Sequence, residues 1–139
     1  MMLYRVPMLP VLICSIMTMA VGMVWYSPFL FGRTWMTLSG IDPDKADECN
    51  KKGMKLTYLA SFLVGLFMSF LVGYVLTRTF SASLIDALKK AVLLWAGFVA
   101  PVLLGGVLWE KKPVTLYLIN AGYYLVALSL ISMIIVSMI

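Results

Sequence analysis

Four long segments without a charged residue constrain this chain more than any other feature of its sequence. They are 27, 22, 19 and 27 residues long and cover positions 6–32, 56–77, 91–109 and 113–139. A helix needs about 20 predominantly apolar residues to cross a bilayer, and a spanning segment must be helical because lipid offers unpaired backbone groups no partner. The sequence therefore predicts an all-α integral membrane protein, a single domain (1–139) with four transmembrane helices in a bundle. We place these helices roughly at 8–31, 55–77, 84–109 and 113–138.

Composition excludes an ordinary water-soluble domain. Of the 139 residues, 63% are hydrophobic and 12% are charged, whereas soluble domains contain about 25% charged residues. Histidine is absent, and with it the commonest zinc ligand and the usual general base of enzymes. We therefore expect no metal site, no cofactor and no catalytic residue. We expect membrane lipid as a partner, and no nucleic acid.

The loop after the first segment carries a helix signal of its own, in "SGIDPDKADECNKKG". Asp42 suits the N-cap of a helix and Pro43 its first position, while Lys51 and Lys52 lie at the other end, before Gly53. Acidic residues at the start and basic residues at the end complement the dipole of a helix. The pattern predicts a short amphipathic surface helix at about 43–52.

Small residues recur every four positions in the second segment. They are Ser61, Gly65, Ser69, Gly73 and Thr77. Small residues on one helix face let another backbone approach closely in lipid. We expect this face to make the closest helix contact in the protein, within one chain or between copies of a homo-oligomer. The alternative is a pore or a substrate path lined by small residues.

The third segment repeats this spacing around a proline. Gly97, Pro101 and Gly105 lie four residues apart, so we expect them to be helix-packing residues as well. Pro101 lacks the N–H group that would bond to the Gly97 carbonyl, which predicts a kink in the middle of the membrane.

The first segment ends in an aromatic-rich stretch, "GMVWYSPFLFGRTW". On position alone, Trp25, Tyr26 and Trp35 suit the aromatic belt at a membrane surface. Pro28 then ends the helix, and Arg33 contacts lipid headgroups. The alternative is a catalytic or ligand-binding motif.

A second group of polar residues surrounds the turn between the third and fourth helices. Glu110 follows Trp109 and precedes Lys111 and Lys112, which predicts a surface ion pair; the alternative is an interfacial ion or proton site. Asn120 is the most polar uncharged side chain in any of the four segments. It predicts an interhelical hydrogen bond more than a ligand contact.

These two groups lie on the same side of the membrane, because the first and third helices run in the same direction. Polar side chains near lipid need partners, and a tyrosine hydroxyl or an indole N–H supplies a donor at that level. We therefore predict that Tyr26 or Trp25 packs against the second group. The candidate functional cluster is Trp25, Tyr26, Pro28, Trp109, Glu110, Asn120 and Tyr123.

The first and third helices also end alike, in "GMVWYSP" and "GGVLWEKKP". Each has a glycine, a tryptophan three positions later and then a proline. Two tandem hairpins related by an axis along the membrane normal would produce such a match. Aromatic belts also produce it by chance, so the repeat is one of two explanations that the sequence allows.

Several of these motifs together resemble a known family of small membrane proteins, grouped as domain of unknown function 1761. The resemblance runs from Gly22 to Ile139 and includes "GMVWYSPFLFGRTWMTLSGI" and "LLWAGFVAPVLLGGVLWEKKPVTLYLINAGYYLV". It implies a four-helix integral membrane protein with no established activity. In that family position 120 is also occupied by aspartate, so the asparagine here is a permitted, uncharged form. The resemblance also implies that "WYSP" is a specific packed corner.

The residues leave three classes of function open. An oligomeric channel or transporter comes first, because small-residue faces, a kinked third helix and Asn120 inside the membrane favour it. An accessory or scaffold subunit of another membrane protein comes second. A lipid-headgroup enzyme that uses Glu110, Asn120, Tyr123 and Arg33 comes third. An exporter of the small multidrug type is disfavoured, because the first helix has no acidic residue.

The distribution of basic residues predicts the orientation of a multi-pass protein in the cell (inner) membrane. The side of loop 1 (32–54) and loop 3 (110–113) carries seven, counting Lys55 at the start of the second helix; they are Arg33, Lys45, Lys51, Lys52, Lys55, Lys111 and Lys112. The opposite side carries four, namely Arg5, Arg78, Lys89 and Lys90. The excess of basic residues places loops 1 and 3 in the cytoplasm and both termini outside.

Overall fold

A computed structural model describes residues 5–40, 54–81 and 83–139, and every element in these ranges is helical. The elements are α1 (Met8–Trp25), α2 (Gly32–Leu38), α4 (Met54–Arg78), α5 (Leu84–Leu94), the π-helical turn η1 (Trp95–Val99), α6 (Ala100–Leu108) and α7 (Val114–Met138). Four stretches are long and apolar enough to span a membrane: α1, α4, the continuous helix 84–108, and α7. The protein is therefore an all-α, multi-pass membrane protein. The amphipathic helix expected at about 43–52 lies outside the described residues.

The first helix is shorter than predicted, because α1 ends at Trp25 and not at residue 31. Pro28 disfavours helical geometry at the preceding Ser27, and the chain turns back instead, with the Gly32 N–H bonded to the Ser27 carbonyl at 2.9 Å. A Cβ at Gly32 would overlap the Tyr26 carbonyl oxygen and the Ser27 backbone, so this tight turn requires glycine. The short helix α2, which was not predicted, starts at Gly32.

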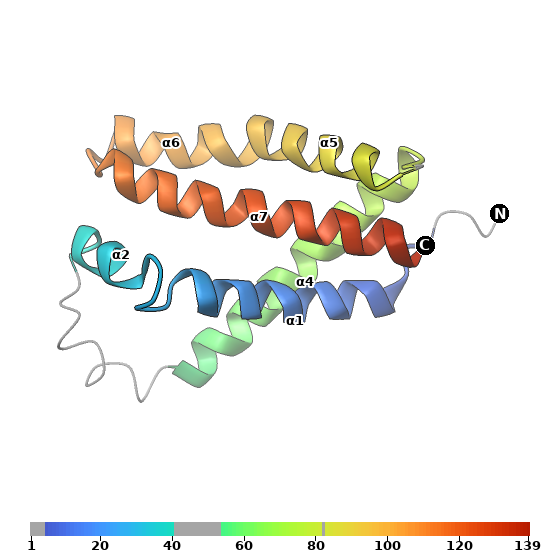
Figure 1. The fold of residues 1–139 in the computed structure, drawn as a ribbon, viewed down its shortest axis with the longest axis horizontal. Coiled ribbons are helices and arrows are strands. Elements are labelled where there is room, and N and C mark those ends of the chain that lie inside the picture. Colours follow the sequence, from blue (N-terminus) through green and yellow to red (C-terminus); the bar gives the residue numbers. More distant parts are fainter. Residues whose placement is uncertain (1–4, 41–53, 82) are drawn as a thin grey trace.

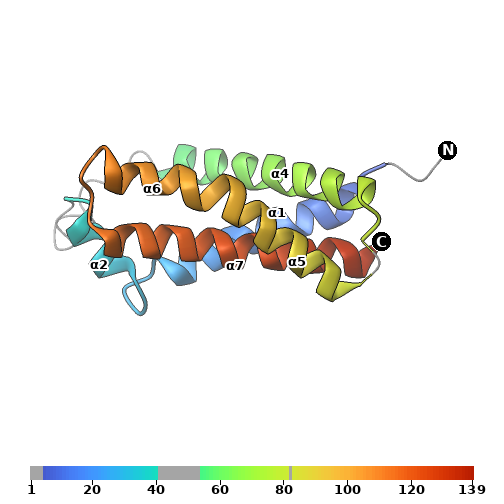
Figure 2. The same ribbon diagram turned by 90° about the horizontal axis from the view of Figure 1, so that it is seen from above.

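The helices are arranged around α7. In Figure 1, α7 lies between α1 on one side and the α5–α6 helix on the other, and α4 crosses behind them. Figure 2 shows that the α5–α6 helix crosses α7 at an angle, with α5 over α7 and α6 displaced to one side. All of the other helical elements pack against α7. α7 is therefore the central helix of the bundle.

The best-packed part of the core lies where α5 and the C-terminal half of α7 meet α1 and α4. Its buried members are Cys14, Val72, Leu76, Ala87, Ala91, Leu128, Ile131 and Ile135. The two alanines of α5 are fully buried, and their small size lets α5 lie close to α7. Toward the other end of the molecule, α6 diverges from α7, and this divergence makes room for the site described below.

The small-residue face of α4 packs inside the chain. A Cβ at Gly65 would lie 2.8 Å from Thr18 Oγ1 on α1, and a Cβ at Gly73 would lie 2.9 Å from Val6 Cγ1 and 3.3 Å from Ile135 Cδ1. Ser69, between the two glycines, is fully buried. Ser61, at the loop 1 end of the same face, is exposed and takes no part in this contact.

The third helix is interrupted, but its glycines do not pack within the chain. Its irregularity is the π-helical turn Trp95–Val99, directly before α6 and Pro101. A π-turn and a missing N–H group both weaken the backbone ladder of a helix. A Cβ at Gly97 or Gly105 would have no atom within 4 Å among the described residues. Within the described residues these two glycines have no close neighbour and Pro101 is exposed, so their packing against another helix stays a prediction.

Candidate functional site

The contact predicted between the first helix and the far end of the chain is present. Tyr26 Oη donates a hydrogen bond of 2.8 Å to Asn120 Oδ1 on α7. The Tyr26 ring also lies 5.5 Å from the Tyr123 ring and 5.5 Å from the Trp35 ring, between centroids. Burial, together with the nearby Tyr124 and Tyr123, raises the pKa of Tyr26, so its hydroxyl stays protonated and remains a donor.

The backbone on both sides of Asn120 is held by two indoles from opposite sides of α7. Trp25 Nε1 donates to the Ile119 carbonyl at 3.0 Å, and Trp95 Nε1 donates to the Ala121 carbonyl at 2.8 Å. Trp25 also packs on α7 at Gly122, where a Cβ would lie 3.1 Å from Trp25 Cζ2. We call Trp25 and Trp95 the indole clamp. With Tyr26 bonded to its side chain, Asn120 is fixed at both backbone and amide.

Tyr123 anchors the same region to the middle of α1. Its hydroxyl donates to the Thr18 carbonyl at 3.1 Å, and its ring lies beside Gly22, where a Cβ would be in ordinary contact with Tyr123 Oη at 3.5 Å. The hydroxyl is therefore already engaged within the bundle. This contact makes Tyr123 a positioning residue for the cluster.

Loop 3 folds back over the end of α6. Lys112 N–H donates to the Gly106 carbonyl at 3.1 Å, and Lys111 adopts a left-handed backbone with φ of 55°. Lys112 Nζ and Glu110 Oε2 form an ion pair at 2.7 Å. The expected ion pair of Glu110 is thus made with Lys112. Both side chains stay more than half exposed, at 55% for Lys112 and 61% for Glu110, so the pair is available to a ligand.

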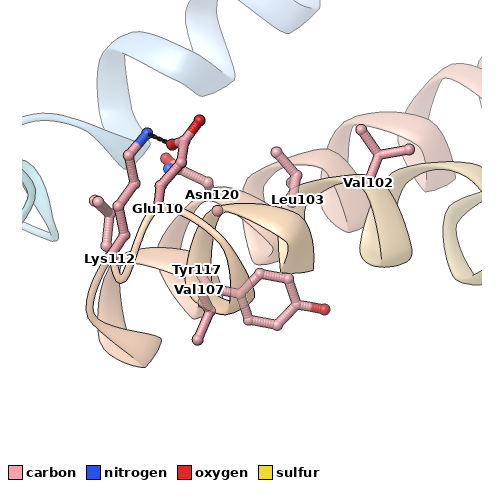
Figure 3. Close-up of a pocket in the computed structure, with 9 residues that line it drawn as sticks. Val102, Leu103, Val107, Glu110, Lys112, Tyr117 and Asn120 are labelled. Atoms are coloured by element: carbon pink, nitrogen blue, oxygen red, sulfur yellow. Dashed lines mark ion pairs between the residues drawn. The ribbon is translucent and has the colours of Figure 1, made fainter.

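A pocket of about 240 Å³ lies between α6 and α7 under this ion pair (Figure 3). Its polar lining consists of Glu110, Lys112, Tyr117 and Asn120; its apolar lining consists of Val102, Leu103, Gly106, Val107 and Leu116. Because Tyr26 occupies Asn120 Oδ1, the Asn120 amide nitrogen, which has no hydrogen-bond partner among the described residues, remains a donor. Figure 3 shows the Asn120 side chain reaching toward the ion pair.

Of the predicted cluster, only Glu110 and Asn120 line this pocket. Trp25 and Tyr26 reach Asn120 and its backbone from the α1 side, and Tyr123 bonds to α1. The other two members lie apart from both groups. Trp109 exposes 87% of its surface, as a residue of the aromatic belt does. Pro28 is exposed in the turn after α1 and shapes the chain there without lining the pocket. The tryptophans that the proposed repeat would relate, Trp25 and Trp109, therefore lie in different environments, one in the indole clamp and one at the surface.

Two residues of the site were not singled out by the sequence for the roles they have. Trp95 belongs to the indole clamp, and Tyr117 Oη donates to the Ala100 carbonyl at 3.2 Å. Tyr117 had a signal, because it shares a helix face with Asn120 at the i, i+3 spacing. Trp95 had none, since its partner is a backbone carbonyl.

A family model for "Protein of unknown function (DUF1761)" matches residues 9–136, nearly the whole chain. No curated protein and no solved structure matches the chain. The matched region contains all four spanning helices, the indole clamp and the α6–α7 pocket. The chain therefore belongs to the DUF1761 family of proteins of unknown function.

Proposed function

We propose that this protein is a small membrane transporter whose ligand site is the α6–α7 pocket. The observation that carries the proposal is a pocket with an ion pair and an amide in its lining, in a chain whose spanning segments hold no charged residue in the middle. A polar cavity around Asn120 is the feature that separates a transporter from a packed scaffold. Polar groups inside a membrane protein are costly and mark ligand or ion pathways.

The interrupted third helix supports movement of the pocket wall. Transporter sites are commonly built next to discontinuous spanning helices, whose broken ladders let one half move against the other. Here the π-turn Trp95–Val99 and Pro101 separate α6, which lines the pocket, from α5, which is packed on α7. Rocking of α6 about this point would open the pocket toward either side, while the indole clamp holds α7 in place.

The test asks whether the pocket meets water from both sides in turn. Leu103→Cys, introduced after Cys14→Ser and Cys49→Ser, is treated with a membrane-impermeant thiol reagent in right-side-out and inside-out vesicles. A transporter predicts labelling in both preparations, because the site alternates in access. Leu93→Cys, on the same helix but 73% exposed outside the pocket, is the control expected to react in neither. Labelling of Leu103→Cys from one side only would overturn the proposal.

An accessory subunit is the second candidate, and one observation favours it. Only 6% of the residues in the spanning window of the helix 84–108 are buried, against 28% in α1 and in α4. In addition, no atom lies close to Gly97 or Gly105 among the described residues. A partner helix, or the second copy of the expected homo-oligomer, would approach most closely there. Purification as a monomer with one stoichiometric partner would favour this function. A lipid-headgroup enzyme is weaker, because the pocket lining offers a single carboxylate, which is ion-paired with Lys112, and because neither Tyr123 nor Arg33 lines the pocket.

We propose the orientation that the basic residues predict, with loops 1 and 3 in the cytoplasm. The pocket opens beside loop 3, so its mouth would then face the cytoplasmic leaflet. Cys49 in loop 1 reports on this directly, since an impermeant thiol reagent should label it in inside-out vesicles. Labelling of Cys49 only in right-side-out vesicles would reverse the orientation.

A further inference from the structure

We propose that the α6–α7 pocket binds a phospholipid whose headgroup carries a primary ammonium and a phosphate, as phosphatidylethanolamine does. The inference rests on the pocket proposed above as the ligand site and names its ligand class. It is argued from the shape of the pocket, from the charges at its mouth and from the donors that remain free there.

The shape of the pocket suits an amphiphile. Its polar residues Glu110 and Lys112 lie at the loop 3 end, whereas Val102 and Leu103 lie deeper along α6. The seven helical residues from Val102 to Leu108 span about 10 Å of α6. A headgroup at the ion pair would therefore leave an acyl chain lying along the apolar wall between α6 and α7, in the direction that chains take in the bilayer.

The charges at the mouth match a zwitterion. Glu110 and Lys112 form an ion pair in which both side chains are more than half exposed. The ammonium of such a headgroup would pair with Glu110 and its phosphate with Lys112. Two ion pairs would then replace one, and every charge would have a partner of opposite sign. A purely anionic headgroup would instead meet the Glu110 carboxylate without a cation of its own.

The free donors favour the phosphate side of such a headgroup. The Asn120 amide nitrogen lines the pocket while its oxygen is held by Tyr26. The first turn of α7 follows Lys112 directly and has no side-chain cap, so its N–H groups add positive potential at the same place. Together with Lys112, these donors place positive potential around the mouth of the pocket, where Glu110 is the one carboxylate of the lining.

The ammonium side favours a primary amine over a quaternary one. A primary ammonium donates hydrogen bonds to a carboxylate, and Glu110 is the carboxylate in the lining. Quaternary ammonium groups are recognised by cages of several aromatic rings. This pocket has one aromatic residue in its lining, Tyr117, and its hydroxyl is bonded to the Ala100 carbonyl.

The experiment is lipid retention measured by native mass spectrometry. The full chain is reconstituted in vesicles with equal parts of phosphatidylethanolamine, phosphatidylcholine and phosphatidylglycerol. It is then extracted into detergent, and the mass of the protein with its bound lipid is measured. We expect phosphatidylethanolamine to be retained about tenfold over each of the others, the effect of one charged hydrogen bond. Glu110→Gln should remove the preference over phosphatidylcholine, and Lys112→Gln should lower the retention of all three lipids.

The matched control is Lys55→Gln, an exposed lysine at the start of α4 outside the pocket, which should leave retention unchanged. Soluble phosphoethanolamine in tenfold excess over the lipid should not displace it, because the apolar wall holds the chain; displacement would show that the ligand is a free zwitterion and overturn the lipid assignment. Equal retention of the three lipids, or a preference that survives Glu110→Gln, would also overturn it.

The two proposals fail separately. Loss of lipid preference with two-sided labelling of Leu103→Cys would remove the ligand class and leave transport standing. Lipid preference with one-sided labelling would make the pocket a fixed lipid site and remove transport.

Discussion

The two sides of α7 are built differently. On one side α1 and α4 lock together, with Gly65 against Thr18 and the Ser15 hydroxyl bonded to the Phe62 carbonyl at 2.8 Å. On the other side the helix 84–108 is held through α5, whereas α6 diverges around the pocket and leaves Gly105 with open space. Both sides carry two glycines eight residues apart, so the spacing alone does not decide how closely a helix packs. The difference separates a rigid half that fixes Asn120 from a half with room for a ligand.

The largest expected effect contrasts Gly65→Leu with Gly105→Leu. At Gly65 even the Cβ of the new side chain would lie only 2.8 Å from Thr18 Oγ1. We therefore expect the unfolding free energy to fall by about 3 kcal/mol or more. At Gly105 no described atom lies within 4 Å, so we expect a change within about 0.5 kcal/mol. The measurement is the thermal unfolding midpoint of each variant in the same detergent. Equal destabilisation would mean that both sides are tightly packed and would end the comparison.

A smaller effect separates two tyrosine hydroxyls, one on each side of α7. Tyr26→Phe removes the 2.8 Å bond to Asn120 and leaves a half-buried amide oxygen unpaired, whereas Tyr117→Phe removes a 3.2 Å bond to a helix carbonyl. We expect losses of about 1 kcal/mol for Tyr26→Phe and about 0.5 kcal/mol for Tyr117→Phe. Chemical unfolding in mixed micelles measures both. A greater loss for Tyr117→Phe would place the more important anchor on the α6 side.

The pH dependence of Tyr26→Phe sharpens the same point. The pKa of Tyr26 is raised in the folded protein by burial, so above the ordinary tyrosine pKa of about 10 the unfolded chain loses a proton that the folded chain keeps. Stability should therefore fall as pH rises from about 10, by up to about 1.4 kcal/mol per pH unit from this group. Tyr26→Phe should show a shallower fall between pH 9.5 and 11. Identical slopes would show that the hydroxyl is not protected in solution.

The smallest effect lies at the turn on the open side. Lys111 holds a left-handed backbone with φ of 55°, which costs a residue with a Cβ about 1 kcal/mol relative to glycine, partly offset by the greater freedom of glycine in the unfolded chain. We expect Lys111→Gly to stabilise the protein by up to about 0.5 kcal/mol in thermal unfolding. Lys111→Ala, which keeps the Cβ and removes the charge, should give no gain. A gain from alanine equal to that from glycine would assign the effect to charge.

The spanning helices could be predicted because the physics that selects them is local. Uncharged runs of bilayer length gave α4 and α7 to within a residue or two of their observed bounds. The predicted end of the first helix, at residue 31, was wrong. The uncharged run continues to Phe31, but Pro28 disfavours helical geometry at Ser27 and the helix ends at Trp25. The family membership was predicted correctly from motifs that span most of the chain.

The candidate site was predictable where polar side chains lacked local partners. Asn120 inside the membrane needs a donor, and the aromatic stretch at the same level supplied Tyr26. The role of Trp95 was not predictable. Its indole donates to a backbone carbonyl, and because every residue has one, the identity of the partner residue gives no signal in the sequence. The open surroundings of Gly97 and Gly105 were not predictable either, because their neighbours depend on how the helices diverge from α7.

The central place of α7 has a consequence for biosynthesis. The ribosome makes α7 after all of the other described helices, yet each of them packs against it. A newly inserted α1–α4 hairpin can close by itself through Gly65, in the way that inserted helices associate pairwise in lipid. The α5–α6 helix, by contrast, has its main packing partner in α7. It therefore lacks that partner until residues 114–138 have been inserted. The order of the helices in the chain therefore predicts that the bundle is completed only after its last helix has been inserted.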